Sequence, residues 1–134
     1  MNTAKHLKQA YPNKTLASQL GSPPLEAYDW AITALFYCAL HFVDAYVFEL
    51  HGIDPEGHTT KRDKATGRNI LGRNDLVKLH IPVIHKDYLS LYSASRRARY
   101  DVAYLALTAA NYYQKLKSNE FARVRQFFRQ QKRW

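Results

Sequence analysis

The feature that most constrains the fold is a long apolar segment over residues 25–50, closed by Gly52. Apolar residues cover most of the circumference of a helix drawn through it, which is typical of a helix buried on most sides. Gly52 stands where a helix C-terminus favours a positive φ, and Ser22, Pro23 and Pro24 suit an N-cap and first turn. The segment therefore predicts a central helix of about 28 residues, roughly 40 Å long.

Three further segments are predicted to be helical, and they cover residues 3–20, 84–99 and 108–131. We expect the first to break at Pro12, because the proline ring and its missing N–H oppose a continuous helix. The second places its apolar side chains on one face at three- and four-residue steps. In the third, Ser118 and Asn119 either interrupt the helix or cap a new turn.

The chain between these segments predicts a loop followed by a short basic helix. Thr60 and Asp63 have the spacing of a capping box, which favours a helix ending near Gly67. No alternating strand pattern is present. The fold class predicted is all-α, a four- to five-helix up-down bundle. It forms a single domain over residues 1–134, with residues 118–134 as a basic C-terminal helix or tail.

Cysteine content and hydropathy predict the compartment. Cys38 is the single cysteine and lies in an apolar run, so we expect a buried, unreactive thiol in a reducing environment. The first ten residues lack the apolar core of a signal peptide. No uninterrupted run of 18 apolar residues occurs, so no membrane-spanning helix and no membrane partner are expected. These features predict a cytoplasmic protein.

Positive charge is segregated along the chain, whose formal net charge is +9. Residues 15–60 contain six acidic side chains and no Lys or Arg, whereas residues 61–134 contain 17 basic and 5 acidic side chains. Clustered positive charge attracts polyanions and releases their counterions. The second half of the chain is therefore the candidate surface for an anionic partner.

Tyr37, His41 and Asp44 share one face of the central helix and form the first candidate site. A His and an Asp on an apolar stripe are costly to bury without partners. They either satisfy one another and neighbouring groups as core polar residues, or they line a polar pocket. In such a pocket His41 could bind phosphate or transfer a proton.

Arg96, Arg99 and Tyr100 form the second candidate site, at the end of the helix over residues 84–99. Arg99 is expected on the core-facing side, where a guanidinium requires an acid, a phosphate or carbonyl groups. One hypothesis is a buried pair between Arg99 and Asp44. The other is a phosphate or nucleotide site.

The C-terminal stretch interleaves arginines with aromatic residues, a pattern that suits single-stranded nucleic acid. The candidate nucleic-acid-binding residues are Arg123, Arg125, Arg129, Lys132 and Arg133. Alternatively, the stretch is an ordinary amphipathic helix whose packing face consists of Phe121, Val124 and Phe128. In this second interpretation the arginines are only exposed to solvent. A basic amphipathic helix at a membrane surface is the third interpretation.

No metal site or cofactor is predicted. Neither His51 with His58 nor His80 with His85 places two ligands on one helical face. Gly-rich phosphate loops, paired-carboxylate motifs and nucleophile elbows are absent, so ordinary hydrolase and kinase functions lack support.

Two segments together resemble HEPN-type domains of uncharacterised bacterial proteins. The first carries Phe36-Tyr37, Ala39, His41, Gly52 and His58, and the second ends in the run from Ser95 to Tyr100. The resemblance covers about residues 25–118. It implies a four- or five-helix bundle, frequent homodimers, and association with RNA, nucleotides, toxin–antitoxin pairs or phage defence.

Ribonuclease members of that family carry an Arg followed, after four to six residues, by a His on the later helix. Positions 101–106, where that His would have to lie, hold no His. Arg73 and His80 have the spacing, but they precede Pro82 and lie outside the matching helix. The resemblance thus favours binding over the usual cleavage chemistry.

The leading hypothesis is a dimeric HEPN-like protein that binds RNA or a nucleotide through Arg96, Arg99 and nearby basic residues. The first alternative is an atypical ribonuclease that uses His41 or His58 as acid–base and Arg99 to stabilise phosphate charge. The second is a structural module whose basic face recruits an acidic partner protein, such as an antitoxin.

Overall fold

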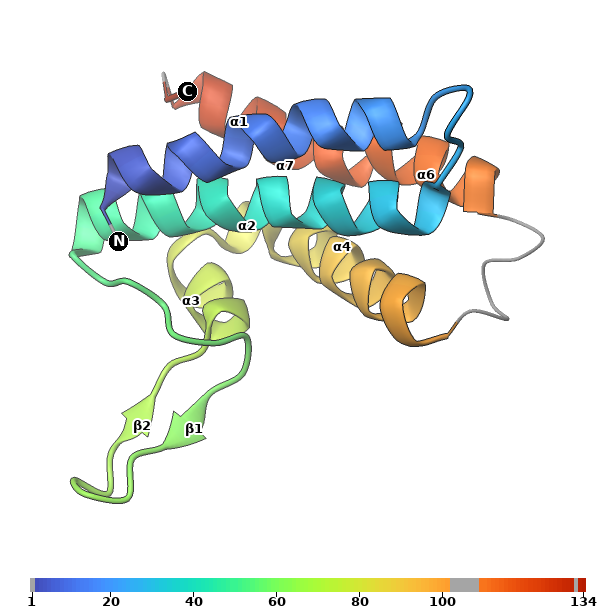
Figure 1. Cartoon of the computed structure of the whole chain (residues 1–134). Coiled ribbons are helices and arrows are strands. Elements are labelled where there is room, and N and C mark those ends of the chain that lie inside the picture. Colours follow the sequence, from blue (N-terminus) through green and yellow to red (C-terminus); the bar gives the residue numbers. More distant parts are fainter. Residues whose placement is uncertain (1, 102–108, 132) are drawn as a thin grey trace.

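The computed structural model describes residues 2–101, 109–131 and 133–134, and it is a bundle of α-helices with one small hairpin (Figure 1). In chain order the elements are α1 (Thr3–Leu20), α2 (Tyr28–His51), β1 (Lys61–Arg62), β2 (Asn69–Ile70), α3 (Arg73–His80), α4 (Pro82–Tyr100), α6 (Ala109–Ser118) and α7 (Glu120–Gln130). The predicted all-α helical bundle is confirmed.

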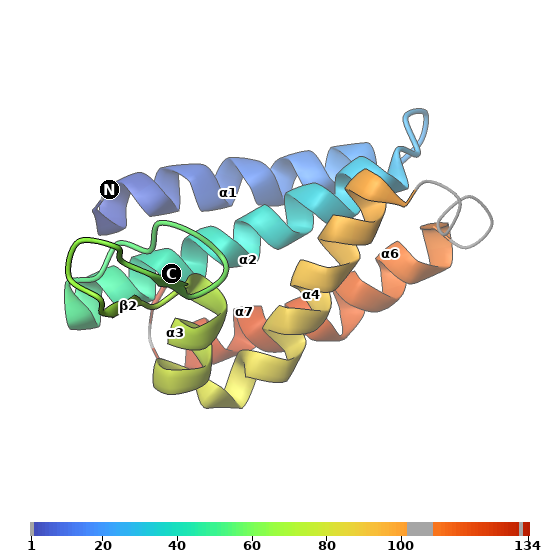
Figure 2. The ribbon, with the colours of Figure 1, turned by 90° about the horizontal axis from the view of Figure 1, so that it is seen from below.

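Helix α2 forms the centre of the bundle, as its apolar pattern predicts. Most of its side chains between Ala31 and Val47 are buried, and α1, α4, α6 and α7 pack against it. Figure 2, a view from below, shows α1 running antiparallel beside α2 and α4 lying across α2. Gly52 ends α2 with φ 67°, in the left-handed region, and its N–H donates to the Phe48 carbonyl. The predicted C-terminus of the central helix is therefore correct.

The predicted N-terminus of α2 is wrong. The helix begins at Tyr28 rather than after Ser22, and no side chain of the described residues caps it. The chain first has to reverse direction after α1, so Pro23 and Pro24 lie in the connection instead of the first helical turn. A hydrogen bond from the Ala27 N–H to the Leu20 carbonyl, 2.7 Å long, closes this connection.

Helix α2 is long and apolar enough to cross a membrane, although it contains no uninterrupted run of 18 apolar residues. In the bundle, however, 72% of its most apolar 18-residue window is buried inside the protein. Such burial is typical of a core helix in a helical domain, because other helices already cover the apolar surface of α2.

Helix α1 is continuous through Pro12, so the predicted break is wrong. The proline ring lies on the exposed side of the helix, while Ala10 and Ala17 are buried against α2. Small side chains at these two positions allow the helices to approach closely. Tertiary packing thus outweighs the local cost of the proline.

The predicted basic helix over residues 60–67 is also wrong, because this segment forms a β-hairpin that protrudes from the bundle (Figure 1). The Asp63 carboxylate accepts hydrogen bonds from the Ala65 N–H at 3.1 Å and from the Thr66 hydroxyl at 2.9 Å. Gly67 follows with φ 69°. Asp63 therefore stabilises a turn rather than a helix start, and two-residue strands are too short to show alternation in a sequence.

The C-terminal segment is two helices, α6 and α7, separated at Asn119. Phe121, Val124 and Phe128 are buried, as the packing-face interpretation predicts. This face holds α7 against α2 and α4. Helix α7 is thus an integral part of the bundle.

We predict that Gly72→Ala, at the base of the hairpin, lowers the free energy of unfolding by about 1–3 kcal/mol, the usual cost of overpacking. A Cβ at Gly72 would overlap the backbone of Thr59, where the two sides of the hairpin approach. Gly57→Ala is the matched control, because a Cβ there meets no atom of the described residues within 4 Å. Urea denaturation of both variants checks the prediction, and equal stabilities would contradict it.

Candidate functional site

A buried ion pair between Asp44 and Arg73 lies at the centre of the candidate site. Arg73 Nε donates to Asp44 Oδ1 at 2.6 Å, and Nη2 donates to Oδ2 at 3.0 Å. Both residues are less than 10% exposed. The bidentate contact joins the middle of α2 to the first residue of α3.

The predicted pair between Asp44 and Arg99 is therefore wrong. The Arg99 guanidinium instead donates to the Tyr37 hydroxyl at 2.9 Å. Tyr37 precedes Asp44 by two helical turns, a distance of roughly 10 Å along α2. Arg99 faces α2, as expected, but it contacts Tyr37 of that helix rather than Asp44.

Arg73 also positions the loop that follows α2. Its Nη2 donates to the Pro55 carbonyl at 3.3 Å, and its Nη1 donates to His58 Nδ1 at 3.2 Å. Because a guanidinium has only donors, His58 Nδ1 is the acceptor and the neutral imidazole carries its proton on Nε2. Backbone bonds from Arg73 and Asn74 to the carbonyls of Gly57 and His58 complete this attachment.

Burial sets the protonation of these groups. Burial raises the pKa of Asp44, and the hydrogen bonds from Arg73 act in the opposite direction. Burial also lowers the pKa of His58, and the positive charges of three nearby arginines lower it further. His58 is therefore uncharged at neutral pH.

His58 and part of α4 line a surface pocket of about 310 Å³, which we call the arginine pocket. Its lining residues are His58, Tyr92, Arg96, Arg99 and Tyr100. Arg96 Nη1 donates to the Tyr92 hydroxyl at 2.9 Å. Neither Arg96 nor Arg99 forms an ion pair with a carboxylate in the described parts of the chain. The arginine pocket thus brings together two guanidinium groups and an uncharged imidazole.

Aromatic rings surround these cations. The Arg99 guanidinium lies 5.7 Å from the ring centre of Tyr37 and 5.5 Å from that of Tyr100, whose side chain is 76% exposed. The rings of His58 and Tyr92 are 5.0 Å apart. Arg99 Nε is buried and has no hydrogen-bond partner among the described residues. A buried donor without a partner is costly, so the hydrogen-bonding capacity of this guanidinium is not fully used by its described neighbours.

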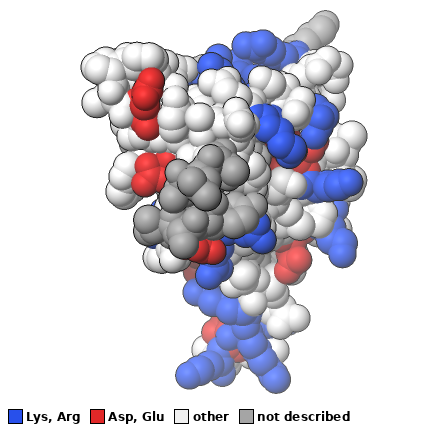
Figure 3. Space-filling model, turned by 90° about the vertical axis from the view of Figure 1, so that its right-hand side faces the viewer, with Lys and Arg blue, Asp and Glu red and all other residues white. Residues whose placement is uncertain are grey.

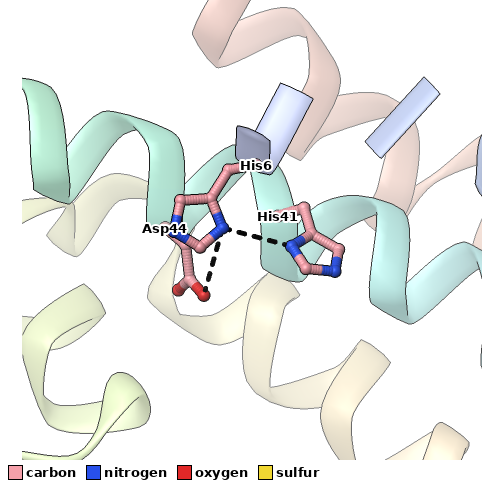
Figure 4. A group of neighbouring side chains, drawn as sticks. All are labelled: His6, His41 and Asp44. Carbon is pink, nitrogen blue, oxygen red and sulfur yellow. Dashed lines mark hydrogen bonds and ion pairs between the residues drawn. The ribbon is translucent and has the colours of Figure 1, made fainter. Parts of the chain in front are cut away.

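His41 and Asp44 lie outside the arginine pocket and meet His6 of α1 (Figure 4). The Nδ1 atoms of His6 and His41 are 3.3 Å apart, and His6 Nδ1 is 3.9 Å from Asp44 Oδ2. His6 Nε2 is 3.0 Å from Asp54 Oδ1. Burial, followed by the nearby His6 and Arg73, lowers the pKa of His41 to about 4. We call His6, His41 and Asp44 the histidine cluster.

The structure regroups the two candidate sites expected from the sequence. Arg96, Arg99 and Tyr100 line the arginine pocket together with His58, and Tyr37 contacts Arg99 beside it, whereas His41 and Asp44 belong to the histidine cluster. Sequence reasoning missed the roles of His6, Arg73 and Tyr92. In the sequence, Arg73 was considered only for its spacing from His80. No sequence pattern indicates the role of His6, because its partners lie far from it along the chain.

Three of the C-terminal arginines have intramolecular partners. Arg123 makes a bidentate contact with Asp87, at 2.7 and 2.9 Å. Arg125 donates to the Trp134 carbonyl and lies 4.6 Å from the ring centre of Phe42, and Arg133 pairs with Glu49. Arg129 is exposed, and Lys132 lies outside the described residues. Their predicted role in binding nucleic acid remains a prediction, but these contacts give three of them a structural role.

The hairpin presents a second group of basic side chains. Lys61, Arg62, Lys64 and Arg68 are all exposed, and blue side chains gather at this lower end of the molecule in Figure 3. The group begins only three residues after His58, so it lies close to the arginine pocket along the chain. Sequence reasoning identified the charge of this segment but not its protruding shape.

Comparison with family models, curated proteins and solved structures finds no match to this chain. The resemblance to HEPN-type domains therefore stays a prediction from the quoted motifs.

We predict that Arg73→Met lowers the free energy of unfolding by about 3–5 kcal/mol, because it leaves Asp44 buried without its counter-ion. Combining it with Asp44→Leu should recover much of that loss, since apolar side chains of similar size can replace a buried pair. Arg99→Met is the matched control, and it should cost far less because it leaves no acid unpaired. Chemical denaturation measures all four proteins; equal losses for Arg73→Met and Arg99→Met would contradict the prediction.

Proposed function

We propose that this protein binds RNA or a nucleotide in the arginine pocket. The observation that carries the proposal is the pair of guanidinium groups, Arg96 and Arg99, which have no carboxylate partner among the described residues. One of their donors, Arg99 Nε, is buried without a hydrogen-bond partner in the parts of the chain that the structure describes. A phosphate group would supply acceptors in the planar geometry that a guanidinium prefers.

The aromatic side chains support a nucleotide rather than a simple anion. Tyr100 is highly exposed beside Arg99, so one face of its ring could stack on a base. His58 Nε2–H adds an uncharged donor at the same site. The pocket volume of about 310 Å³ is at the lower end of the range for small-molecule sites, which suits one nucleotide unit.

The basic hairpin favours RNA over a free nucleotide. Its four exposed cations are continuous in sequence with the loop that carries His58. A chain of nucleotides leaving the pocket would find further positive charge there, whereas a mononucleotide would not reach it. Flexible basic side chains contact phosphates without reading the base sequence, so we propose binding with little sequence preference.

The cellular role that we propose follows from the resemblance to HEPN-type domains, with which an all-α bundle is compatible. It is that of a cytoplasmic, homodimeric protein in a toxin–antitoxin or phage-defence system. A basic module that recruits an acidic, antitoxin-like protein is the competing function. The test of RNA binding below separates the two.

We expect purified protein to bind fluorescein-labelled single-stranded RNA, and Arg99→Gln to weaken binding about ten- to hundred-fold, the value of a hydrogen bond to a charged group. The slope of log K against log [salt] should become shallower by roughly 0.7, the loss of one phosphate contact. Fluorescence anisotropy over a salt series measures both quantities.

Lys117→Gln is the control, because it removes one positive charge from an exposed position on α6 that belongs to no candidate site. Equal effects of Arg99→Gln and Lys117→Gln would show that only net charge matters and would contradict a site in the arginine pocket. Replacing Arg62 and Lys64 by Gln should weaken binding of RNA but not of ATP. Binding of an acidic protein partner with no binding of RNA or ATP would favour the recruitment function.

An atypical ribonuclease is the second candidate, and the place of His58 in the arginine pocket favours it. His58 lies with Arg99 in this pocket, and its Nε2–H could donate a hydrogen bond to a scissile phosphate. To act as a general base, its Nδ1 would first have to lose the hydrogen bond from Arg73. His41 lies in the histidine cluster instead. Of the two histidines considered from the sequence, His58 is therefore the better candidate.

We predict RNA binding without cleavage, which incubation of the protein with end-labelled RNA and gel analysis would check. Cleavage that His58→Ala abolishes and His85→Ala retains would contradict this prediction and establish the ribonuclease. His85 is a suitable control because it lies at the far end of α4 from Arg99.

A further inference from the structure

The histidine cluster brings three metal-ligating groups together from two helices. His6 comes from α1, and His41 and Asp44 come from adjacent turns of α2 (Figure 4). One ligand atom from each residue lies within 4.8 Å of the other two. His6 and Asp44 are buried, while His41 is partly exposed, so an ion could enter past the His41 ring.

The hydrogen-bond partners of His6 orient it as a ligand. Its Nε2 faces the Asp54 carboxylate, which accepts hydrogen bonds, so the proton lies on Nε2. Its Nδ1 lone pair is then directed at His41 and Asp44. A carboxylate behind a histidine is the usual second layer of a zinc site, where it fixes the tautomer and orientation of the ring.

The spacing also fits a metal ion. Two nitrogens bound to one tetrahedral Zn²⁺ at 2.0–2.1 Å lie about 3.3 Å apart, and the two Nδ1 atoms are 3.3 Å apart. Asp44 Oδ2 is slightly farther, at 3.9 Å from His6 Nδ1, and a small movement of side chains would complete the triangle. Arg73 donates a hydrogen bond to each oxygen of the Asp44 carboxylate, and so orients it as a second-layer partner does.

We propose that His6, His41 and Asp44 bind a divalent transition-metal ion such as Zn²⁺, with Asp54 and Arg73 orienting the ligands. Two imidazole nitrogens and one carboxylate select this class over Mg²⁺ and Ca²⁺, which prefer oxygen ligands. Three protein ligands leave a fourth position for water or another molecule. The proposal does not depend on ligand binding in the arginine pocket.

The test is isothermal titration of chelator-treated protein with ZnCl₂, together with the visible absorption of the Co²⁺ form. We expect one equivalent to bind, and His41→Gln to weaken binding at least ten-fold. Asp54→Asn should weaken it about ten- to hundred-fold, as loss of a second-layer carboxylate does. Asp54 is exposed enough that this variant should fold normally.

His80→Gln is the control, because the rings of His51 and His80 stack 3.8 Å apart near the surface and could bind metal on their own. This variant should keep the binding of one equivalent. Zn²⁺ should also raise the melting temperature of the wild type and of His80→Gln, but not of His41→Gln. If circular dichroism shows that His41→Gln does not fold, the affinity of Asp54→Asn and the visible spectrum of the Co²⁺ form test the proposal instead. A tetrahedral Co²⁺ spectrum is then the expected result.

Three results would overturn the proposal. The first is no binding by the wild type, and the second is loss of binding in His80→Gln with retention in His41→Gln. The third is equal affinity in the wild type and Asp54→Asn together with an octahedral Co²⁺ spectrum. In each case the histidine cluster would be a network of hydrogen bonds that holds α1 against α2.

Discussion

The ion pair between Asp44 and Arg73 is the interaction on which both candidate sites depend. It crosses from the central helix to α3, and the remaining donors of Arg73 hold the Pro55 carbonyl and the His58 ring. Without it, the loop after α2 would lose its main attachment to the core. The pair is costly to form, since two charges leave water, and its bidentate geometry offsets that cost with two hydrogen bonds.

Sequence patterns predicted the parts of the fold that depend on local chemistry. The apolar circumference of α2, the Gly52 terminus and the buried face of α7 all follow from residue spacing within one helix. The connection at Pro23 and the hairpin at Asp63 were mispredicted because their geometry is set by where neighbouring helices begin and end. Pro12 shows the same effect, since packing of α1 on α2 overrides a local preference.

The candidate site was only half predictable for a related reason. Tyr37, His41, Asp44, Arg96, Arg99 and Tyr100 were all identified, because polar groups on apolar faces are conspicuous. Their partners were not, since Arg73 and His6 reach them from other elements. A sequence shows which buried groups need partners. Whether Asp44 pairs with Arg99 or with Arg73 depends on which of the two arginines the tertiary structure places beside Asp44 on α2.

Arg73 also separates two regions of opposite electrostatic character. On one side, Asp44 and Asp54 surround the two imidazoles of the histidine cluster, an arrangement suited to a cation. On the other side, the arginine pocket has Arg96 and Arg99 with no acidic partner in the described chain, an arrangement suited to an anion. One guanidinium contacts both Asp44 of the histidine cluster and His58 of the arginine pocket, so a single buried side chain joins the two sites and fixes where each of them lies.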